Sequence, residues 1–202
     1  MRFIKGFVMV VGIIGIITII ALCLGYFLYS LTPWTQAKMT PVTVTADAAQ
    51  SFDDKIAALK KEAKEASAAN QVKEVQLVLT EGEINSKLTE LLAEGALPKN
   101  VKKVLINFRE KQFLVYTVID VPGLAAKVGA IGNIKIVDEN PKVTLQDLDI
   151  GKLPITNSNT ERAEGFLDFA IKGQMPNIPM KVTGVDIGKH NITITGTTKA
   201  AN

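Results

Sequence analysis

An uncharged run of 25 residues near the N-terminus constrains this chain more than any other feature. Phe7 to Leu31, FVMVVGIIGIITIIALCLGYFLYSL, contains no acidic, basic or histidine side chain. A helix of that length measures roughly 37 Å, which exceeds the ~30 Å hydrocarbon core of a bilayer. We therefore expect residues 7–31 to form a transmembrane helix that separates the short N-terminus from the remainder of the chain.

Two other readings of this run fit less well. A cleaved signal peptide has an apolar region of about 7–15 residues followed by small residues at the cleavage site. Here the run is longer and leads into the bulky stretch YFLYSLTPW. A lipoprotein anchor on Cys23 would want a small residue before it, whereas Leu22 is large. We interpret Cys23 as a small apolar residue inside the span.

The flanking charges predict the orientation of the span. Arg2 and Lys5 precede it, and the first charge after it is Lys38. Under the positive-inside rule, residues 1–6 stay in the cytoplasm, and Tyr29 and Trp34 lie near the outer interface. We expect a single-pass protein of the cell membrane with an extracytoplasmic C-terminal domain.

The composition of the outer part excludes several classes of protein. It has no cysteine, so neither a disulfide nor a thiolate metal site is available. Without Arg2 and Lys5, 21 of the 23 basic residues remain against 20 acidic ones. A net charge near +1 gives no electrostatic footprint for nucleic acid.

The motifs of common enzymes are absent from the sequence as well. There is no GxSxG, no GxxxxGK[ST] and no HExxH. The single histidine, His190, lies in a GKHN turn, where we expect an exposed residue rather than a catalytic base. The carboxylates of DENP and DLD match no calcium loop and are interpreted as solvated. We expect no enzymatic activity, no cofactor and no metal.

The residues after the span are expected to form a tether and then one domain. TPWTQAKMTPVTVTADAAQ, with two prolines, predicts a tether over residues 32–50. A helix over 51–69 follows, with Ser51 as its N-cap and Asp53 and Asp54 at the positive end of its dipole. Its apolar stripe indicates packing on the domain, although a stalk remains an alternative. The domain as a whole is expected over 51–202, with its core over 73–198.

The stretch LTEGEINSKLTELL predicts a strand that leads into a capped helix. Thr80 and Glu83 have the spacing of a capping box, and Gly95 suits the end of a helix over 81–93. A helix of about 13 residues is marginal alone, so its apolar face needs a surface to cover. That face consists of Ile84, Leu88, Leu91 and Leu92.

The second half of the chain predicts hairpins around a second short helix. VKKVLINFREKQFLVYTVIDV reads as two strands with a turn at REKQ, and both faces of the second strand are largely apolar. VPGLAAKVGAIG interrupts the strand pattern and is interpreted as a connecting loop or a flexible rim. NIKIVDENPKVTLQDLDI reads as another hairpin, residues 159–171 as a helix, and PMKVTGVDIGKHNITITG as a final hairpin. The expected class is α+β, with a curved, mostly antiparallel sheet and helices on one face.

Four pieces of the sequence together resemble a known group of proteins. LTEGEINSKL, VPGL, VTLQDLDIGKLPI and MPNIPMKVTGVDIGKHNITITG are similar to TULIP-like bacterial envelope proteins, of the YpmS type and the LmeA-like phospholipid-binding type. The resemblance covers about residues 73 to 198. It implies a sheet wrapped on helices with an apolar groove for acyl chains. Tubular lipid carriers often pair two such units, whereas this chain has one.

Two functions are compatible with these observations. In the first, a membrane-anchored extracytoplasmic module binds a phospholipid or another acyl lipid between sheet and helices. In the second, the domain has a closed core and serves as a cell-envelope scaffold for a protein partner; a homodimer is a further possibility. The candidate groove residues are Ile84, Leu88, Leu91, Leu92, Val104, Ile106, Phe108, Phe113, Val115, Phe166, Phe169 and Ala170.

Overall fold

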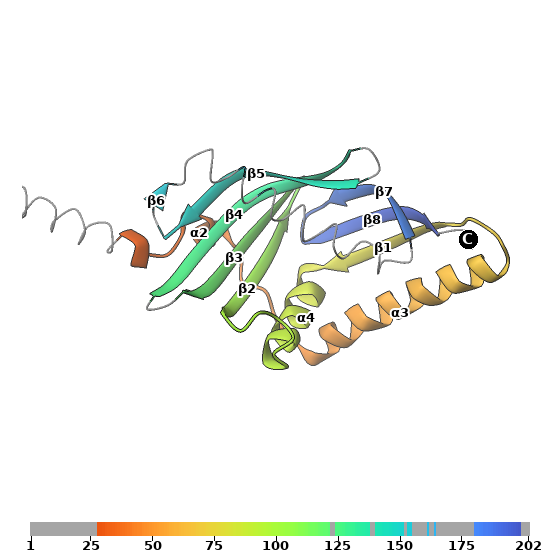
Figure 1. Cartoon of the computed structure of the whole chain (residues 1–202), viewed down its shortest axis with the longest axis horizontal. Helices are drawn as coiled ribbons and strands as arrows, with labels where there is room; N and C mark the ends of the chain where they lie inside the picture. Colours follow the sequence, from red (N-terminus) through yellow and green to blue (C-terminus); the bar gives the residue numbers. More distant parts are fainter. Residues whose placement is uncertain are drawn as a thin grey trace, which may run out of the picture.

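The computed structural model describes residues 28–121, 124–137, 140–151, 153–154, 161, 164 and 180–198 (Figure 1). Three helices and eight strands have their bounds in these ranges. They are α2 (Trp34–Lys38), α3 (Ala46–Ala68), β1 (Glu74–Thr80), α4 (Glu81–Ala93), β2 (Val101–Arg109), β3 (Gln112–Val121), β4 (Leu124–Val137), β5 (Asn140–Ile150), β6 (Leu153–Pro154), β7 (Met180–Ile187) and β8 (Asn191–Thr198).

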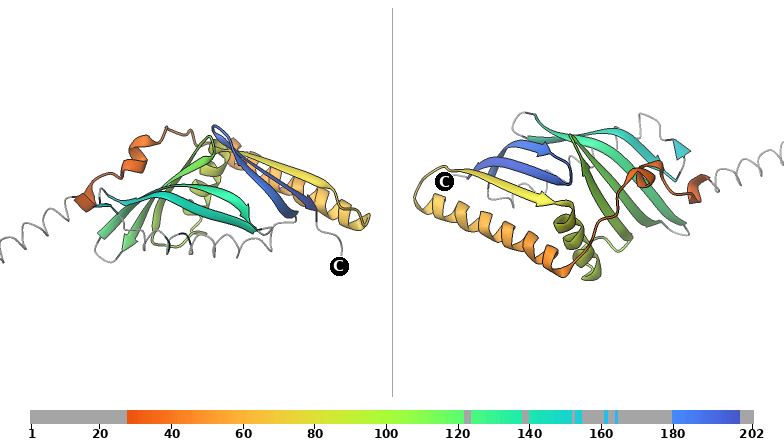
Figure 2. Two further views of the ribbon diagram at one scale, coloured as in Figure 1. Left: turned by 90° about the horizontal axis from the view of Figure 1, so that it is seen from above. Right: turned by 180° about the vertical axis from the view of Figure 1, so that it is seen from behind.

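The strands form two antiparallel sheets. One has three strands in the order β1-β8-β7, and the other has five in the order β2-β3-β4-β5-β6. Both are twisted and curved, and β7 lies next to β4 and β5 where the sheets meet (Figures 1 and 2). The expected α+β class with curved antiparallel strands is confirmed, although the strands are divided between two sheets.

Backbone hydrogen bonds fasten the two sheets at their junction. The N–H of Lys111, in the β2–β3 turn, donates to the carbonyl of Ile187 at 2.7 Å. The N–H of His190, in the β7–β8 turn, donates to the carbonyl of Phe108 on β2 at 3.4 Å. Turns of one sheet thus close onto strands of the other, so the junction is a fixed corner.

Helix α4 begins where the sequence indicates. The Thr80 side chain accepts from the N–H of Glu83, and the Glu83 side chain accepts from the N–H of Thr80, which completes a capping box. On the next turn, buried Asn85 lies against the outer edge of β2. Its Nδ2 donates to the Ile106 carbonyl at 2.7 Å, and its Oδ1 accepts from the Ile106 N–H at 2.8 Å. The helix therefore covers a strand edge that would otherwise expose unpaired backbone groups.

Helix α3 begins at Ala46, five residues earlier than the expected start at Ser51. Thr45 is its N-cap and accepts from the N–H of Ala48. Ser51 lies inside the helix instead, and its hydroxyl donates to Glu83 Oε1 at 2.6 Å. The helix packs against β1, β8 and α4, as a helix on the domain rather than a stalk. Its buried residues are Ala49, Leu59, Ala63 and Ala66.

Residues 28–45, named the N-terminal strap below, lie along the outer face of the five-stranded sheet (Figure 2). Thr35 donates to buried Asp149 from its N–H at 3.1 Å and from its hydroxyl at 2.9 Å. The N–H of Thr40 donates to Asn107 Oδ1 at 2.7 Å. The expectation of a tether over 32–50 missed these contacts, because both partners lie far away in the sequence. For the same reason the interpretation of Asp149 as solvated is wrong, since its carboxylate is buried against Thr35.

The strap also explains why β3 is apolar on both faces. Leu114 and Tyr116 are 0% and 4% exposed on the strap side of the strand. Phe113, on the opposite side, is 7% exposed. The prediction that both faces are covered is confirmed, and burial on the strap side raises the pKa of Tyr116.

Strand β4 runs straight through the stretch expected to be a loop. Its glycines are positions of close approach rather than strand breakers. A Cβ on Gly129 would lie 2.3 Å from Asp149 Oδ1 and 2.6 Å from Thr35 Cβ. A Cβ on Gly132 would lie 2.7 Å from both Phe113 Cζ and the Thr144 carbonyl oxygen. The interpretation of residues 121–132 as a loop or rim is thus wrong at Val121, which ends β3, and from Leu124 onward.

Two expected helices fall mainly outside the described residues. Of residues 7–31, only Leu28 to Leu31 are described, and none of the helices in the described part is long and apolar enough to cross a bilayer. Of residues 159–171, Glu161 and Glu164 are described and helical. Glu164 Oε1 accepts from the N–H of Leu145 at 2.6 Å.

Candidate functional site

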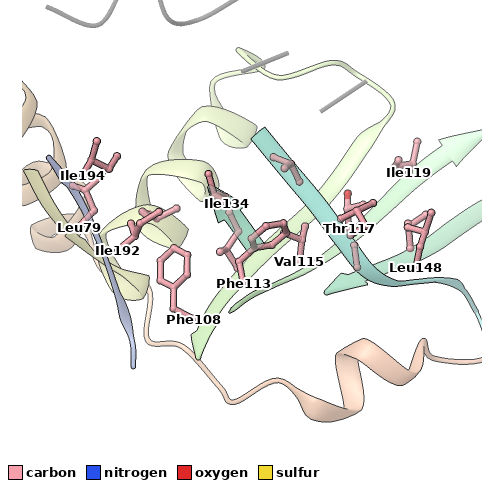
Figure 3. Close-up of a pocket in the computed structure, with 16 residues that line it drawn as sticks. Leu79, Phe108, Phe113, Val115, Thr117, Ile119, Ile134, Leu148, Ile192 and Ile194 are labelled. Carbon is pink, nitrogen blue, oxygen red and sulfur yellow. The ribbon is translucent and has the colours of Figure 1, made fainter. Parts of the chain in front are cut away.

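An apolar cavity of about 580 Å³ lies between the two sheets and α4 (Figure 3). Its volume is in the ~300–1,000 Å³ range of sites for small molecules. Of the sixteen residues that line it in the described part of the chain, fifteen are aliphatic or aromatic, and the other is Thr117. They are Leu79, Ile84, Ile106, Phe108, Phe113, Val115, Thr117, Ile119, Val128, Ala130, Ile134, Val143, Leu145, Leu148, Ile192 and Ile194.

The two-residue repeat of the strands places these side chains in the cavity. Phe113, Val115, Thr117 and Ile119 alternate along β3, so all four point to its inner face. The register pairs Phe113 with Gly132 on β4, where the missing side chain leaves room for the aromatic ring. Neighbouring strands repeat the pattern, which gives the five-stranded sheet one continuous apolar face.

The described lining residues offer the cavity no free hydroxyl. Thr117 Oγ1 donates to the backbone carbonyl of Lys103 at 2.9 Å. Its side chain therefore presents a methyl group to the cavity while the hydroxyl is bonded along the sheet. Water in such a space would lack hydrogen-bond partners, so the space favours an apolar occupant.

Burial differs between the two ends of the cavity. The buried lining residues lie at the sheet junction, and Phe108, Phe113 and Val143 are 5%, 7% and 2% exposed. At the opposite end, every lining residue is half-buried, namely Thr117, Ile119, Val128 and Leu148. Figure 3 shows this second end around Ile119 and Leu148, away from Ile192 and Ile194. The buried lining residues thus lie toward the junction, which also has the half-buried Ile84, Ile106 and Ile194, whereas the far end of β3, β4 and β5 has half-buried residues alone.

The structure brings some of the twelve candidate groove residues together. Ile84, Ile106, Phe108, Phe113 and Val115 line the cavity. Leu88, Leu91, Leu92 and Val104 are half-buried but do not belong to its lining. Phe166, Phe169 and Ala170 lie outside the described residues. The α4 face thus contributes only its first aliphatic residue, since the next turns of the helix pack beyond the cavity.

Sequence reasoning missed most of the strand residues. Thr117 and Ile119 share a face with Phe113 and Val115, and that alternation was the available signal. Val128 and Ala130 were missed because their segment was interpreted as a loop. Leu79, Ile192 and Ile194 come from the other sheet, and sequence alone does not place that sheet beside β3.

The buried carboxylates of Glu81 and Glu83 do not line the cavity, but they bind the elements that surround it. Glu81 is 6% exposed, accepts from the Phe108 N–H through Oε1, and lies 3.0 Å from His190 Nδ1 through Oε2. His190 lies in a turn with φ 71° and has a half-exposed side chain, so the turn prediction is confirmed. This link ties the β7–β8 turn to the edge of β2.

Glu83 holds the base of α4 to α3. Burial alone would raise the pKa of Glu83, but hydrogen bonds from Lys55, Ser51 and Thr80 outweigh burial and lower the pKa from 4.5 to about 2. Lys87 bonds Asp53 at 2.7 Å and Glu90 at 2.9 Å, and both bonds raise the pKa of Lys87. These contacts fix the helix pair beside the cavity.

No protein-family model and no curated protein sequence matches this chain. Within the described ranges, no three His, Cys, Asp or Glu residues gather as a group that could hold a metal ion. The resemblance to TULIP-like envelope proteins therefore stays a hypothesis, and the cavity is the site on which a function can be argued.

Proposed function

We propose that this protein is a membrane-anchored, extracytoplasmic lipid-binding module that holds an acyl chain in the cavity between its two sheets. The observation that carries the proposal is a cavity of about 580 Å³ whose described lining consists of apolar side chains and one threonine with a bonded hydroxyl. A binding site for a sugar, nucleotide or peptide would need convergent polar groups in its lining. The proposal includes the TULIP-like assignment of the domain.

The energetics favour a flexible hydrocarbon ligand. An empty space of this size forgoes the dispersion contacts of its lining atoms. A chain of about a dozen methylenes gains roughly 0.8 kcal/mol per buried CH₂, or about 10 kcal/mol before the cost of ordering it. No polar recognition of the chain itself is required for such binding.

Binding rather than catalysis is the activity proposed here. Among the described lining residues, the one hydroxyl belongs to Thr117 and donates to a backbone carbonyl rather than to a side-chain base that could activate it. The sequence prediction of an uncharged span over 7–31 supplies the anchor, with the N-terminus in the cytoplasm.

Mass spectrometry of the purified protein tests the proposal. The full chain is expressed in cells, purified in a mild detergent, washed and extracted with organic solvent. We expect a phospholipid or other acyl lipid at close to one molecule per chain. Recovery of a folded protein with no bound lipid, which also fails to take up lipid from vesicles, would instead favour the closed-core scaffold.

A matched pair of variants on β4 distinguishes the cavity from the protein surface. Ala130→Phe adds a ring inside the cavity, whereas Ala125→Phe adds the same ring on the exposed outer face of the strand. We expect Ala130→Phe to lower bound lipid at least fivefold and Ala125→Phe to leave it unchanged. Equal lipid content in the two variants, with both folded by circular dichroism, would contradict the cavity as the binding site.

A further inference from the structure

The N-terminal strap is fastened along its whole length to the domain. Ser30, at its start, accepts from Lys127 Nζ at 3.0 Å through its carbonyl. Thr35 bonds Asp149 in the middle, and the Lys38 carbonyl accepts from Arg109. At its end, the Thr45 N–H donates to Ser86 Oγ at 3.1 Å. A segment bound at so many points cannot act as a loose linker.

The strap meets the sheet at one end of the molecule. The carbonyl oxygens of Leu28 and Tyr29 lie against Gly151, where a Cβ would come within 2.5 Å and 2.3 Å of them. Gly151 follows β5 and donates its N–H to the carbonyl of Lys127. In Figure 1 this end lies opposite the far end of α3. The expected span would therefore join the domain at the outer ends of β4 and β5.

That same end holds the end of the cavity whose described lining residues are all half-buried. Val128 lies beside Lys127 on β4, and the register pairs Val128 with Thr117 on β3 and with Ile150 on β5. Two large apolar side chains of the strap, Leu28 and Trp34, are 37% and 56% exposed nearby. Trp is favoured at the interface between membrane and water.

We propose that the cavity opens toward the bilayer at the end formed by Thr117, Ile119, Val128 and Leu148, named the portal below, and that the strap holds the portal there to receive an acyl chain from the outer leaflet. This inference rests on the proposed function and adds the orientation of the site. A free chain of 18 residues would have an end-to-end distance of roughly 23 Å, enough to let the domain turn in any direction. The strap removes that freedom.

Fluorescence quenching in vesicles tests the orientation. The full chain, with Cys23→Ser, carries a single fluorophore either at Ala125→Cys, beside the portal, or at Lys64→Cys, on the distal half of α3. Both positions are exposed. In phosphatidylcholine vesicles with a nitroxide-labelled headgroup, we expect quenching at position 125 to exceed quenching at position 64 severalfold. Equal quenching, or stronger quenching at position 64, would overturn the orientation.

A wedge between strap and sheet tests whether the strap sets this orientation. Gly129→Ala forces a methyl group against Asp149 and Thr35, whereas Gly82→Ala, the control, meets no atom closer than 3.7 Å. We expect the ratio of quenching at positions 125 and 64 to fall toward one in Gly129→Ala and to stay unchanged in Gly82→Ala. Thr35→Val, which replaces the hydroxyl bonded to Asp149 with a methyl group of similar size, should lower the ratio partly if the wedge variant unfolds. An unchanged ratio in a folded strap variant would refute the role of the strap.

Lipid content separates this inference from the proposed function. If lipid co-purifies while both labels are quenched equally, the cavity binds lipid but the strap does not orient the portal toward the bilayer. If position 125 is quenched as expected and no lipid is found or taken up, the orientation stands and the lipid-binding function fails.

Discussion

Glu83 is the residue at which capping, charge and packing coincide. Its carboxylate closes the capping box of α4 and also binds Ser51 and Lys55 of α3, with the Lys55 Nζ 2.7 Å from Oε1. The side chain is 8% exposed, so water screens these bonds little. One carboxylate therefore joins the two helices that flank the cavity.

This arrangement predicts a loss of stability in acid that depends on Glu83. Its folded-state pKa of about 2 lies below the ordinary 4.5, so its contribution is complete above about pH 4.5 and is lost as the pH falls toward 2. A shift of that size corresponds to about 3 kcal/mol. We expect Glu83→Gln to lower the urea midpoint clearly at pH 7 and only slightly at pH 2.5. Glu62→Gln, on the exposed face of α3, should change neither, and a loss at Glu83 that is independent of pH would contradict the assignment.

At the scale of elements, α4 acts as a substitute strand for the edge of β2. Asn85 supplies one donor and one acceptor to Ile106, and Glu81 accepts from the N–H of Phe108. Glu81 and Asn85 lie one helical turn apart on α4. The backbone groups that they bind, on Phe108 and Ile106, lie two residues apart on β2, so the two spacings match. The wall of the cavity thus ends in a helix rather than in an exposed edge.

Asn85→Ala tests this pairing. The change leaves the N–H and the carbonyl of Ile106 without partners, and each buried unpaired group costs roughly 1–3 kcal/mol. We expect a loss of about 2–4 kcal/mol in urea unfolding and faster hydrogen exchange at the Ile106 amide. Thr89→Ala removes a hydroxyl that donates to the Asn85 carbonyl of the same helix, and this loss should cost less than about 1 kcal/mol because that carbonyl keeps its helical environment. Equal losses would show that the helix edge contact carries no special weight.

Local signals were readable from the sequence, and distant ones were not. The capping box of Thr80 and Glu83, the start of α4 and the turns at REKQ and GKHN depend on residues close in the chain, and the structure has them. Gly129 looks like a loop residue in the sequence. The structure requires glycine there because Thr35 and Asp149, which are distant in the chain, leave no room for a Cβ atom. For the same reason, the sequence patterns identified five of the residues that line the cavity. They did not identify Ile192 and Ile194 of β8, whose place in the lining depends on how the two sheets meet.

For the whole molecule, the strap is part of the fold as well as the connection to the expected span. It covers Leu114 and Tyr116, which are 0% and 4% exposed, on the side of the sheet opposite the cavity. The sheet is therefore a middle layer between the strap and the cavity. Removal of the strap would expose its outer apolar face to water.

Two truncated chains test this role of the strap. One begins at Leu28 and keeps the strap, and the other begins at Ala46 and lacks it. Exposure of Leu114 and Tyr116 should cost roughly 1.5–3 kcal/mol for each large side chain, and loss of the Thr35–Asp149 bonds adds to this cost. We expect the shorter chain to unfold at a urea concentration at least 1 M lower, given a slope of about 1–3 kcal/mol per molar. If the strap were a dispensable tether, the two chains would have equal urea midpoints, because a linker without contacts contributes nothing to the free energy of unfolding.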